Sequence, residues 1–187
     1  RVLAFEARLF DVPPTVWLQQ FQRQTFSEML QFGYLSYFLF LPFIGFVLYR
    51  RADKDPFFGL MAATMLAYVA CYVIYLAFPT EGPAHTLRHL HTQPIPEGPL
   101  ASVVLFTQRA GTHGNAFPSA HIAGAVASAL FAVKYAIRYA PLLLALLALM
   151  CVGAVYDRYH YASDIAGGLM VGIAATLIVM RKIERTC

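Results

Sequence analysis

The chain has 187 residues, of which 59% are hydrophobic and 13% are charged, and its formal net charge is +4. Soluble domains usually contain only about 45–50% apolar residues, so this composition excludes an ordinary soluble protein. It indicates an all-α, polytopic transmembrane bundle formed by residues 1–187 as one domain. We expect membrane lipids around it and no nucleic-acid partner.

The first 25 residues mix apolar and charged side chains, and Pro13-Pro14 interrupts them. This pattern predicts one or two amphipathic helices lying in the membrane interface, with Trp17 at the level of the headgroups. The alternative is that the segment is the remnant of a spanning helix.

Five apolar stretches are predicted to cross the bilayer. In chain order they comprise residues 26–49, 57–78, 118–134, 141–156 and 162–180. Residues 79–117 contain five prolines and four of the six histidines of the chain, which predicts an extramembrane loop with short helices, one of them near residues 84–91. Three glycines of the last stretch, Gly167, Gly168 and Gly172, predict close packing against a neighbouring helix.

The basic residues of the short turns indicate an orientation. With five spans, every lysine of the chain (Lys54, Lys134 and Lys182) falls on one side. The positive-inside rule assigns that side to the cytoplasm. The polar segments then gather on the opposite side, in the periplasm or a lumen, and we expect a multi-pass protein of a bacterial inner membrane whose active site faces the periplasm.

Residues 156–164 (Tyr-Asp-Arg-Tyr-His-Tyr-Ala-Ser-Asp) place an arginine, a histidine and two aspartates between two apolar stretches. Charges near lipid are costly and mark a functional site by default. His160 and Asp164 are spaced i, i+4, so in a helix the carboxylate can hold the imidazole in one tautomer. Arg158 can offer a planar donor group to an anion. Asp157 is expected to pair with a basic neighbour or cap a helix. The three tyrosines are expected to join the aromatic belt, with the alternative that one of them lines the headgroup pocket.

A second polar segment, residues 114–121, carries Pro118, Ser119, Ala120 and His121. If Pro118 starts a helix, Ser119 and His121 lie in its first turn, where free N–H groups and the helix dipole favour an anion. His121 could then donate a proton to a leaving oxygen while His160 attacks phosphorus. Two predicted antiparallel spans separate the segments, which returns both to one side of the membrane.

Pro118-Ser119-Ala120-His121, followed by His160-x-x-x-Asp164, resembles the type 2 phosphatidic acid phosphatase superfamily, with alanine in place of the glycine of its Pro-Ser-Gly-His motif. The lysine and arginine-proline of its first motif are missing at residues 78–84, and Ala154 stands where the arginine of the third motif is usual. The position of Arg158 resembles the branch of inositol phosphorylceramide and sphingomyelin synthases instead.

The resemblance implies a metal-independent lipid phosphatase that cleaves a lipid phosphomonoester or pyrophosphate. His160 would form a phosphohistidine, Asp164 would orient it, and His121 would be the general acid. The implied phosphate-binding residues are Ser119, Ala120, Asn115 and Arg158, with Arg109, Arg88 and His113 as further candidates.

Three other functions stay open. The first is a lipid phosphotransferase that moves a phospho-headgroup to an alcohol. The second is a non-catalytic lipid-binding or transport protein. The third is a metal hydrolase, which we disfavour because the loop histidines (His85, His89 and His91) lack a supporting carboxylate pattern. We expect neither a metal nor a cofactor.

Overall fold

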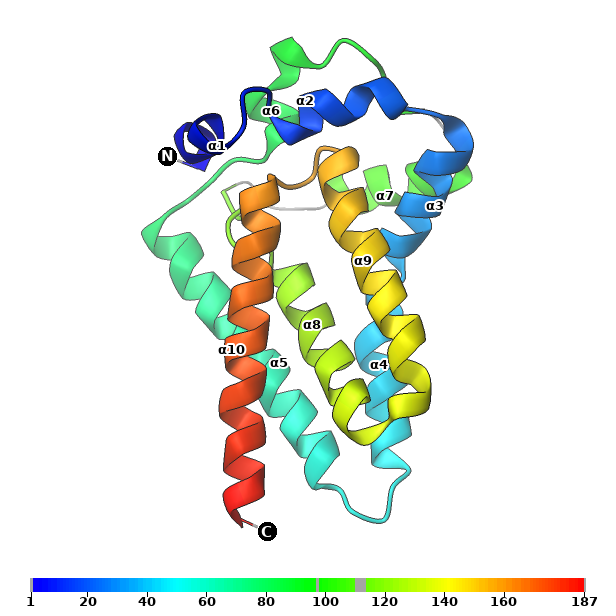
Figure 1. The fold of residues 1–187 in the computed structure, drawn as a ribbon, viewed down its shortest axis with the longest axis vertical. Coiled ribbons are helices and arrows are strands. Elements are labelled where there is room, and N and C mark those ends of the chain that lie inside the picture. The colour runs from blue at the N-terminus through cyan, green and yellow to red at the C-terminus, as the bar shows by residue number, and fades with distance from the viewer. Residues whose placement is uncertain (1, 97, 110–113, 187) are drawn as a thin grey trace.

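The computed structural model describes residues 2–96, 98–109 and 114–186, and these residues form a helical bundle (Figure 1). The α-helices are α1 (Val2–Leu9), α2 (Pro14–Leu18), α3 (Gln24–Leu35), α4 (Tyr37–Tyr49), α5 (Asp55–Ala77), α6 (Pro83–Thr86), α7 (Pro99–Arg109), α8 (Ala120–Tyr135), α9 (Ala140–Tyr156) and α10 (Ala162–Thr186). Short 3₁₀ helices cover Gln19–Phe21, Arg88–Leu90 and Ile137–Tyr139. No strand is present in the described part of the chain, which confirms the all-α prediction.

Three of the described helical segments are long and apolar enough to cross a membrane, at residues 55–77, 137–156 and 162–185. A fourth span arises if α3 and α4, which meet at an angle of 43°, are counted together. The bend lies at Ser36, whose hydroxyl donates to the Gly33 carbonyl at 2.6 Å, and a side-chain bond of this kind distorts a helix. The remaining predicted span corresponds to α8, which has only 16 residues.

The short helix α8 lies at the centre of the bundle and contacts α4, α5, α9 and α10. Its buried face consists largely of alanine, glycine and serine, and small residues allow helix backbones to approach closely. On α10, a β-carbon at Gly168 would lie 2.5 Å from the Ser119 carbonyl oxygen, and one at Gly172 would lie 2.6 Å from that of Ala123. The predicted close packing of this glycine face is therefore confirmed.

Gly172→Ala is expected to destabilise the protein by about 1–3 kcal/mol, because the added methyl group would overlap the backbone of α8. The matched control is Gly45→Ala in α4, where the nearest atoms would lie 3.6 and 3.9 Å from the new β-carbon. That change should leave stability unchanged or raise it by about 0.4–1 kcal/mol. Thermal unfolding in detergent measures both, and equal unfolding temperatures for the two variants would contradict the predicted contact.

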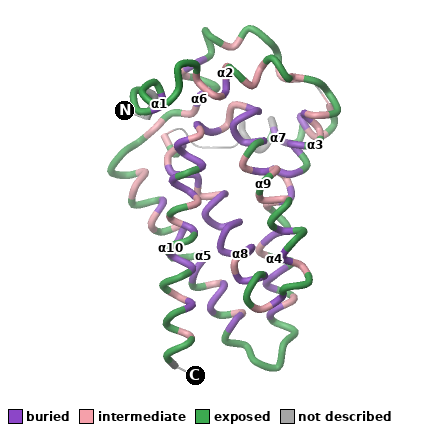
Figure 2. Tube along the Cα trace, viewed as in Figure 1, coloured by how far each residue is buried: buried purple, intermediate pink, exposed green. Residues whose placement is uncertain are grey.

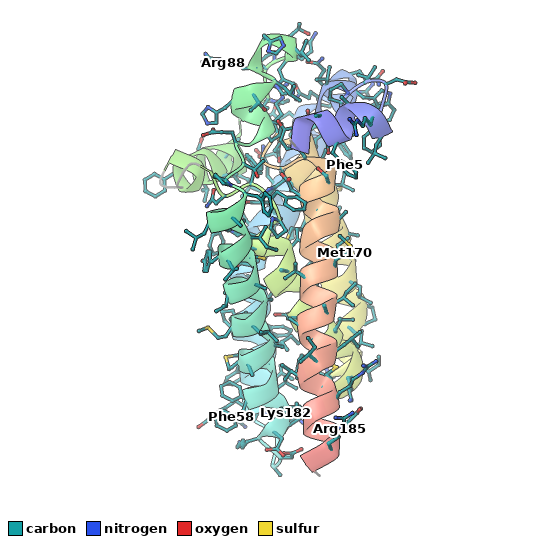
Figure 3. All side chains as sticks on the ribbon, turned by 90° about the vertical axis from the view of Figure 1, so that its left-hand side faces the viewer. Phe5, Phe58, Arg88, Met170, Lys182 and Arg185 are labelled. Carbon is teal, nitrogen blue, oxygen red and sulfur yellow. The ribbon has the colours of Figure 1, made fainter. Side chains whose placement is uncertain are left out.

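The two ends of the bundle differ in character. Helices α1, α2 and α6 lie across the end that carries the N-terminus, while the C-terminal end of α10, with Lys182 and Arg185, lies at the other (Figures 1 and 3). Lys134 forms an ion pair with Glu184 at that second end. Figure 2 shows buried positions concentrated along α8, and the outer faces of the long helices carry exposed apolar side chains such as Leu76 and Phe58. Such an outer surface suits a membrane protein.

Candidate active site

The two polar segments meet at the end of the bundle where α8 begins, α9 ends and α10 begins (Figure 1). The amide N–H of Ser119, just before α8, donates to the Asp164 carbonyl oxygen in the first turn of α10 at 3.0 Å. Residues 45 positions apart in the chain are thus joined directly by their backbones. The predicted juxtaposition of the two segments is present in the structure.

His160 is held by both of its ring nitrogens. Its Nδ1 lies 3.0 Å from the Ala116 carbonyl oxygen and 3.4 Å from Oδ2 of Asp164. Since both of these atoms are acceptors, Nδ1 carries a proton, and in the neutral form of the ring the lone pair is then on Nε2. Nε2 lies 3.2 Å from Oγ of Ser119, whose hydroxyl can donate to it. A neutral imidazole with a free electron pair on Nε2 is the form that a nucleophile requires.

Asp164 is completely buried at the start of α10. Its Oδ2 accepts hydrogen bonds from the Tyr161 amide at 2.8 Å and from Nδ1 of His160. Its Oδ1 has no hydrogen-bond partner. One oxygen, Oδ2, thus bonds both the backbone and the imidazole, which suits an orienting residue.

Helix α8 begins at Ala120, so the prediction that Pro118 is its first residue and Ser119 part of its first turn is wrong. Ser119 is the N-cap: its ψ of 107° is extended, and its Oγ accepts from the Ile122 amide at 3.5 Å. Serine is a preferred N-cap because its oxygen can satisfy a free N–H of the first turn. The same hydroxyl thus both caps α8 and faces His160.

Tyr75 of α5 occupies a position that the sequence did not predict. Its hydroxyl accepts from the Ala120 amide at 3.2 Å and donates to the Pro118 carbonyl at 2.7 Å. One N–H group expected to face a phosphate is therefore already bonded within the protein. Nothing in the sequence distinguishes Tyr75 from the other tyrosines of the second span, because the contact depends on the packing of α5 against α8.

His121 lies among aromatic side chains from other helices. Its ring centroid is 6.1 Å from that of Tyr34 and 4.9 Å from that of Tyr37. The Tyr37 hydroxyl bonds that of Tyr68 at 2.5 Å, and the Tyr34 ring packs at 4.9 Å on that of Tyr159. These tyrosines form one wall beside His121, and no pattern in the sequence predicts that they lie there.

Arg158 adopts a left-handed backbone conformation, with φ of 64°. Its amide donates to the Val155 carbonyl, and the Tyr159 amide donates to that of Ala154 at 2.9 Å. This is the Schellman arrangement that ends many helices, in which the left-handed position is usually glycine. A left-handed non-glycine residue costs roughly 1–2 kcal/mol. The turn brings the chain back so that the His160 amide also donates to the Ala154 carbonyl at 3.0 Å.

The guanidinium of Arg158 donates to the Gln93 carbonyl in the segment between α6 and α7. When the side-chain amide of Gln22 is oriented with its oxygen toward Arg158, the guanidinium also donates to that oxygen at 2.9 Å. In this structure the guanidinium thus joins the N-terminal region to the long loop.

The remaining predicted phosphate-binding residues are more dispersed. Asn115 is exposed and pairs by its backbone with Thr80. Arg88 is exposed and lies at the outermost part of the end of the bundle opposite Lys182 and Arg185 (Figure 3). Arg109 ends α7, but its side chain and all of His113 lie outside the described residues. The residues that the structure brings together are therefore Ser119, Ala120, His160 and Asp164, with His121 in the first turn of α8.

Two of the three tyrosines of the turn do not lie at the membrane interface as expected. Tyr156 and Tyr161 are completely buried, and the Tyr156 hydroxyl bonds Oγ of Ser27 at 2.9 Å. The Tyr161 hydroxyl bonds that of Thr86 in α6. The expectation of interfacial tyrosines is therefore wrong at both positions, because α3 and α6 pack over them.

Asp157 is buried directly after α9, and its Oδ1 accepts from Nε2 of Gln31 in α3 at 3.4 Å. Asp157 is the C-cap of α9, as the expectation that it caps a helix allows, and its amide donates to the Gly153 carbonyl. Its side chain accepts its hydrogen bond from an amide and not from a basic neighbour. Its Oδ2 has no hydrogen-bond partner. Burial raises the pKa of Asp157 from the usual 3.8 to about 7.

Asp157→Asn is expected to change how stability depends on pH. The folded protein holds the Asp157 proton up to about pH 7, whereas the unfolded chain releases it near 3.8. The protonated carboxyl therefore contributes fully to the free energy of unfolding below pH 3.8. This contribution falls by about 1.4 kcal/mol per pH unit as pH rises, and it is gone above the folded-state pKa of about 7. The unfolding temperature of the asparagine variant relative to wild type should therefore rise between pH 4 and 7. Asp53→Asn, in the exposed loop after α4, is the control, and parallel profiles for all three proteins would contradict the prediction.

The residues that the structure describes contain no group of three or more His, Cys, Asp or Glu side chains placed to hold a metal ion. Among the loop histidines, Nε2 of His91 lies 3.2 Å from the Thr15 hydroxyl, and burial lowers its pKa to about 4. His85 and His89 are exposed.

The chain matches a known protein family. A family model described as PAP2 superfamily, the type 2 phosphatidic acid phosphatases, matches residues 1–178 and thus nearly the whole chain. Searches among curated proteins and among solved structures gave no significant match. The family match covers both polar segments and the helices that carry them. The chain therefore belongs to the PAP2 superfamily of helical membrane proteins, whose chemistry is of the phosphatase and phosphotransferase type.

Proposed function

We propose that this protein is a metal-independent lipid phosphatase that works through a phosphohistidine at His160. The observation that carries the proposal is the position of the His160 ring. Its Nδ1 faces the Ala116 carbonyl and Asp164, and its Nε2 faces the N-terminus of α8, which also carries His121. This combines an imidazole nucleophile, an orienting carboxylate and a second imidazole at one end of the bundle.

The proposed reaction has two steps. In the first, Nε2 of His160 attacks phosphorus, the bond to the ester oxygen breaks, and protonated His121 donates its proton to that oxygen. In the second, neutral His121 takes a proton from water, the water oxygen attacks phosphorus, and the N–P bond breaks. Inorganic phosphate leaves, and both imidazoles return to their starting protonation states. Each proton transfer of this type contributes about 10²–10⁴-fold to rate.

The phosphate would lie beside the N-cap of α8. The Ser119 hydroxyl, which now faces Nε2 of His160, could donate to a phosphate oxygen instead. The positive end of the α8 dipole favours the same oxygens. Arg158 is the nearest arginine in sequence to His160, and it could supply positive charge if its guanidinium left the Gln93 carbonyl.

Transfer of the phosphoryl-containing headgroup to an alcohol is the second candidate. It is favoured by the seclusion of His160, which is only 8% exposed and lies at the end of the bundle that α1, α2 and α6 cover (Figure 1). Excluding water from a phosphohistidine would leave time for an alcohol to accept the group. The same residues serve both reactions, so only the acceptor differs.

A substrate panel tests the proposal. Purified protein in lipid nanodiscs is given phosphatidic acid, an isoprenyl pyrophosphate or a phospholipid diester, in excess chelator, with and without a long-chain alcohol. Release of inorganic phosphate from a monoester or pyrophosphate supports the phosphatase, and headgroup transfer to the alcohol supports the second candidate. Absence of both reactions with every substrate, or complete loss of activity on adding chelator, would overturn the proposal.

A further inference from the structure

Helix α1 buries a carboxylate and exposes large apolar side chains. Its acidic residue Glu6 is only 1% exposed, whereas Phe5 and Leu9 are 55% and 58% exposed. Carboxylates are almost never fully buried unless they are paired. Within α1, Glu6 therefore faces the protein, whereas Phe5, Leu9 and the second charged residue, Arg8, are exposed. An apolar outer face suits contact with lipid.

The partner of Glu6 is the first turn of α10. Its Oε1 accepts from the Ser163 amide at 2.9 Å and from Oγ of Ser163 at 3.1 Å. The first four N–H groups of a helix have no partner within that helix, so Glu6 caps α10 from a distant part of the chain. These are bonds between residues 157 positions apart.

Ser163 directly precedes Asp164, and the same turn is held at two other points. The Asp164 carbonyl accepts from the Ser119 amide at 3.0 Å, and Oδ2 of Asp164 accepts from the Tyr161 amide and from His160. Glu6 is thus the third attachment of the turn that sets the position of the His160 ring. It is also the only one of these three contributed by the N-terminal helix.

We propose that Glu6 is a positioning residue of the active site, which holds the first turn of α10 through Ser163 and thereby aligns Asp164 and His160. This inference rests on the proposed function of His160. It makes α1 part of the catalytic machinery, because the seating of α1 and the alignment of the nucleophile depend on the same two hydrogen bonds. Glu6 itself does not contact the reacting atoms.

The test compares Glu6→Gln, Glu6→Asp and Glu6→Ala. The glutamine oxygen can still accept both bonds from Ser163, whereas the aspartate is one methylene too short and alanine has no acceptor. We expect kcat per folded molecule, and the single-turnover rate of His160 phosphorylation, to fall about 10–100-fold in the alanine and aspartate variants and about threefold or less in the glutamine variant. A misplacement of about 1 Å can cost this much. KM should stay within about twofold, since the phosphate-binding groups are unchanged.

Two further variants separate positioning from general stability. Glu184→Gln makes the same chemical change at the exposed, opposite end of α10 and should leave kcat unchanged. Ser163→Ala should lower kcat by a few fold, but adding it to Glu6→Ala should cause no further loss, because the Ser163 hydroxyl has lost its acceptor once Glu6 is removed. The folded fraction of each variant is determined by size-exclusion chromatography and thermal unfolding.

The outcomes are distinguishable. If Glu6→Ala lowers only the folded fraction, with kcat per folded molecule unchanged, or if the glutamine variant is as impaired as the alanine variant, the positioning role is wrong while the proposed function stands. If His160→Ala retains full activity, the proposed function itself is wrong, whatever Glu6 does. Loss of phosphorylation in Glu6→Ala, with rescue by glutamine, supports both.

Discussion

His160→Ala is expected to lower the turnover of a lipid phosphate by roughly 10⁴-fold or more, because removal of a covalent nucleophile eliminates the main reaction path. The ring that is lost has its Nε2 facing the N-cap of α8 and its Nδ1 held by Ala116 and Asp164. The variant should fold normally, since alanine leaves the backbone bond from residue 160 to Ala154 intact. Substrate binding should persist, so KM or ligand affinity should change little.

The measurement is phosphate release together with trapping of the intermediate. Wild-type protein quenched during turnover of a ³²P-labelled substrate should carry label that is stable in base and lost in acid, as expected for phosphohistidine, and the variant should carry none. His89→Ala removes an exposed histidine of the same end of the molecule and is the matched control. A His160→Ala turnover within tenfold of wild type would show that the nucleophile lies elsewhere. Radioactive label on His160 would exclude the alternative that the protein only binds or transports lipids.

His121→Gln is expected to lower turnover of an alkyl phosphate by about 10²–10⁴-fold, the usual contribution of a general acid or base. The loss should depend on the leaving group, because a leaving group of low pKa departs without a proton. With 4-nitrophenyl phosphate the first step should proceed nearly as fast as in wild type. The second step should stay slow, since no base activates water.

The diagnostic result is therefore accumulation of phosphohistidine at His160 in the His121→Gln variant when the substrate is 4-nitrophenyl phosphate. A burst of nitrophenol followed by a slow phase measures this in a stopped-flow experiment. His89→Gln is again the control. Equal losses for alkyl and nitrophenyl substrates, without a burst, would contradict the acid–base role and leave His121 as a residue of the aromatic wall formed with Tyr34 and Tyr37.

Sequence reasoning succeeded where the signal is local or periodic. The apolar stretches locate the long helices. The i, i+4 spacing of His160 and Asp164 predicts their contact, which is present at 3.4 Å, although His160 lies in the turn before α10 and not in a helix as that spacing assumed. Two antiparallel helices between the polar segments are enough to predict that both lie at one end of the bundle. The glycines of α10 likewise indicate a close helix contact without identifying the helix.

It failed where a side chain's role depends on a distant partner. Tyr75 bonds the Ala120 amide from 45 positions away, and Gln31 bonds Asp157 from 126 positions away. No spacing rule connects such residues, because their distance is set by how α5 and α3 pack in the bundle. The start of α8 was misplaced by two residues for a related reason: Ser119 acts as the cap, and its extended conformation excludes it from the helix.

The sequence by itself determined the helical membrane class, the superfamily motifs and the pairing of His160 with Asp164, since these depend on composition and on neighbours within one or two helical turns. Only the tertiary structure decided that Arg158 reaches Gln93, that tyrosines surround His121, and that Glu6 caps α10. Each of these contacts joins segments whose separation in space is determined by helix packing, and packing depends on the whole set of buried side chains at once.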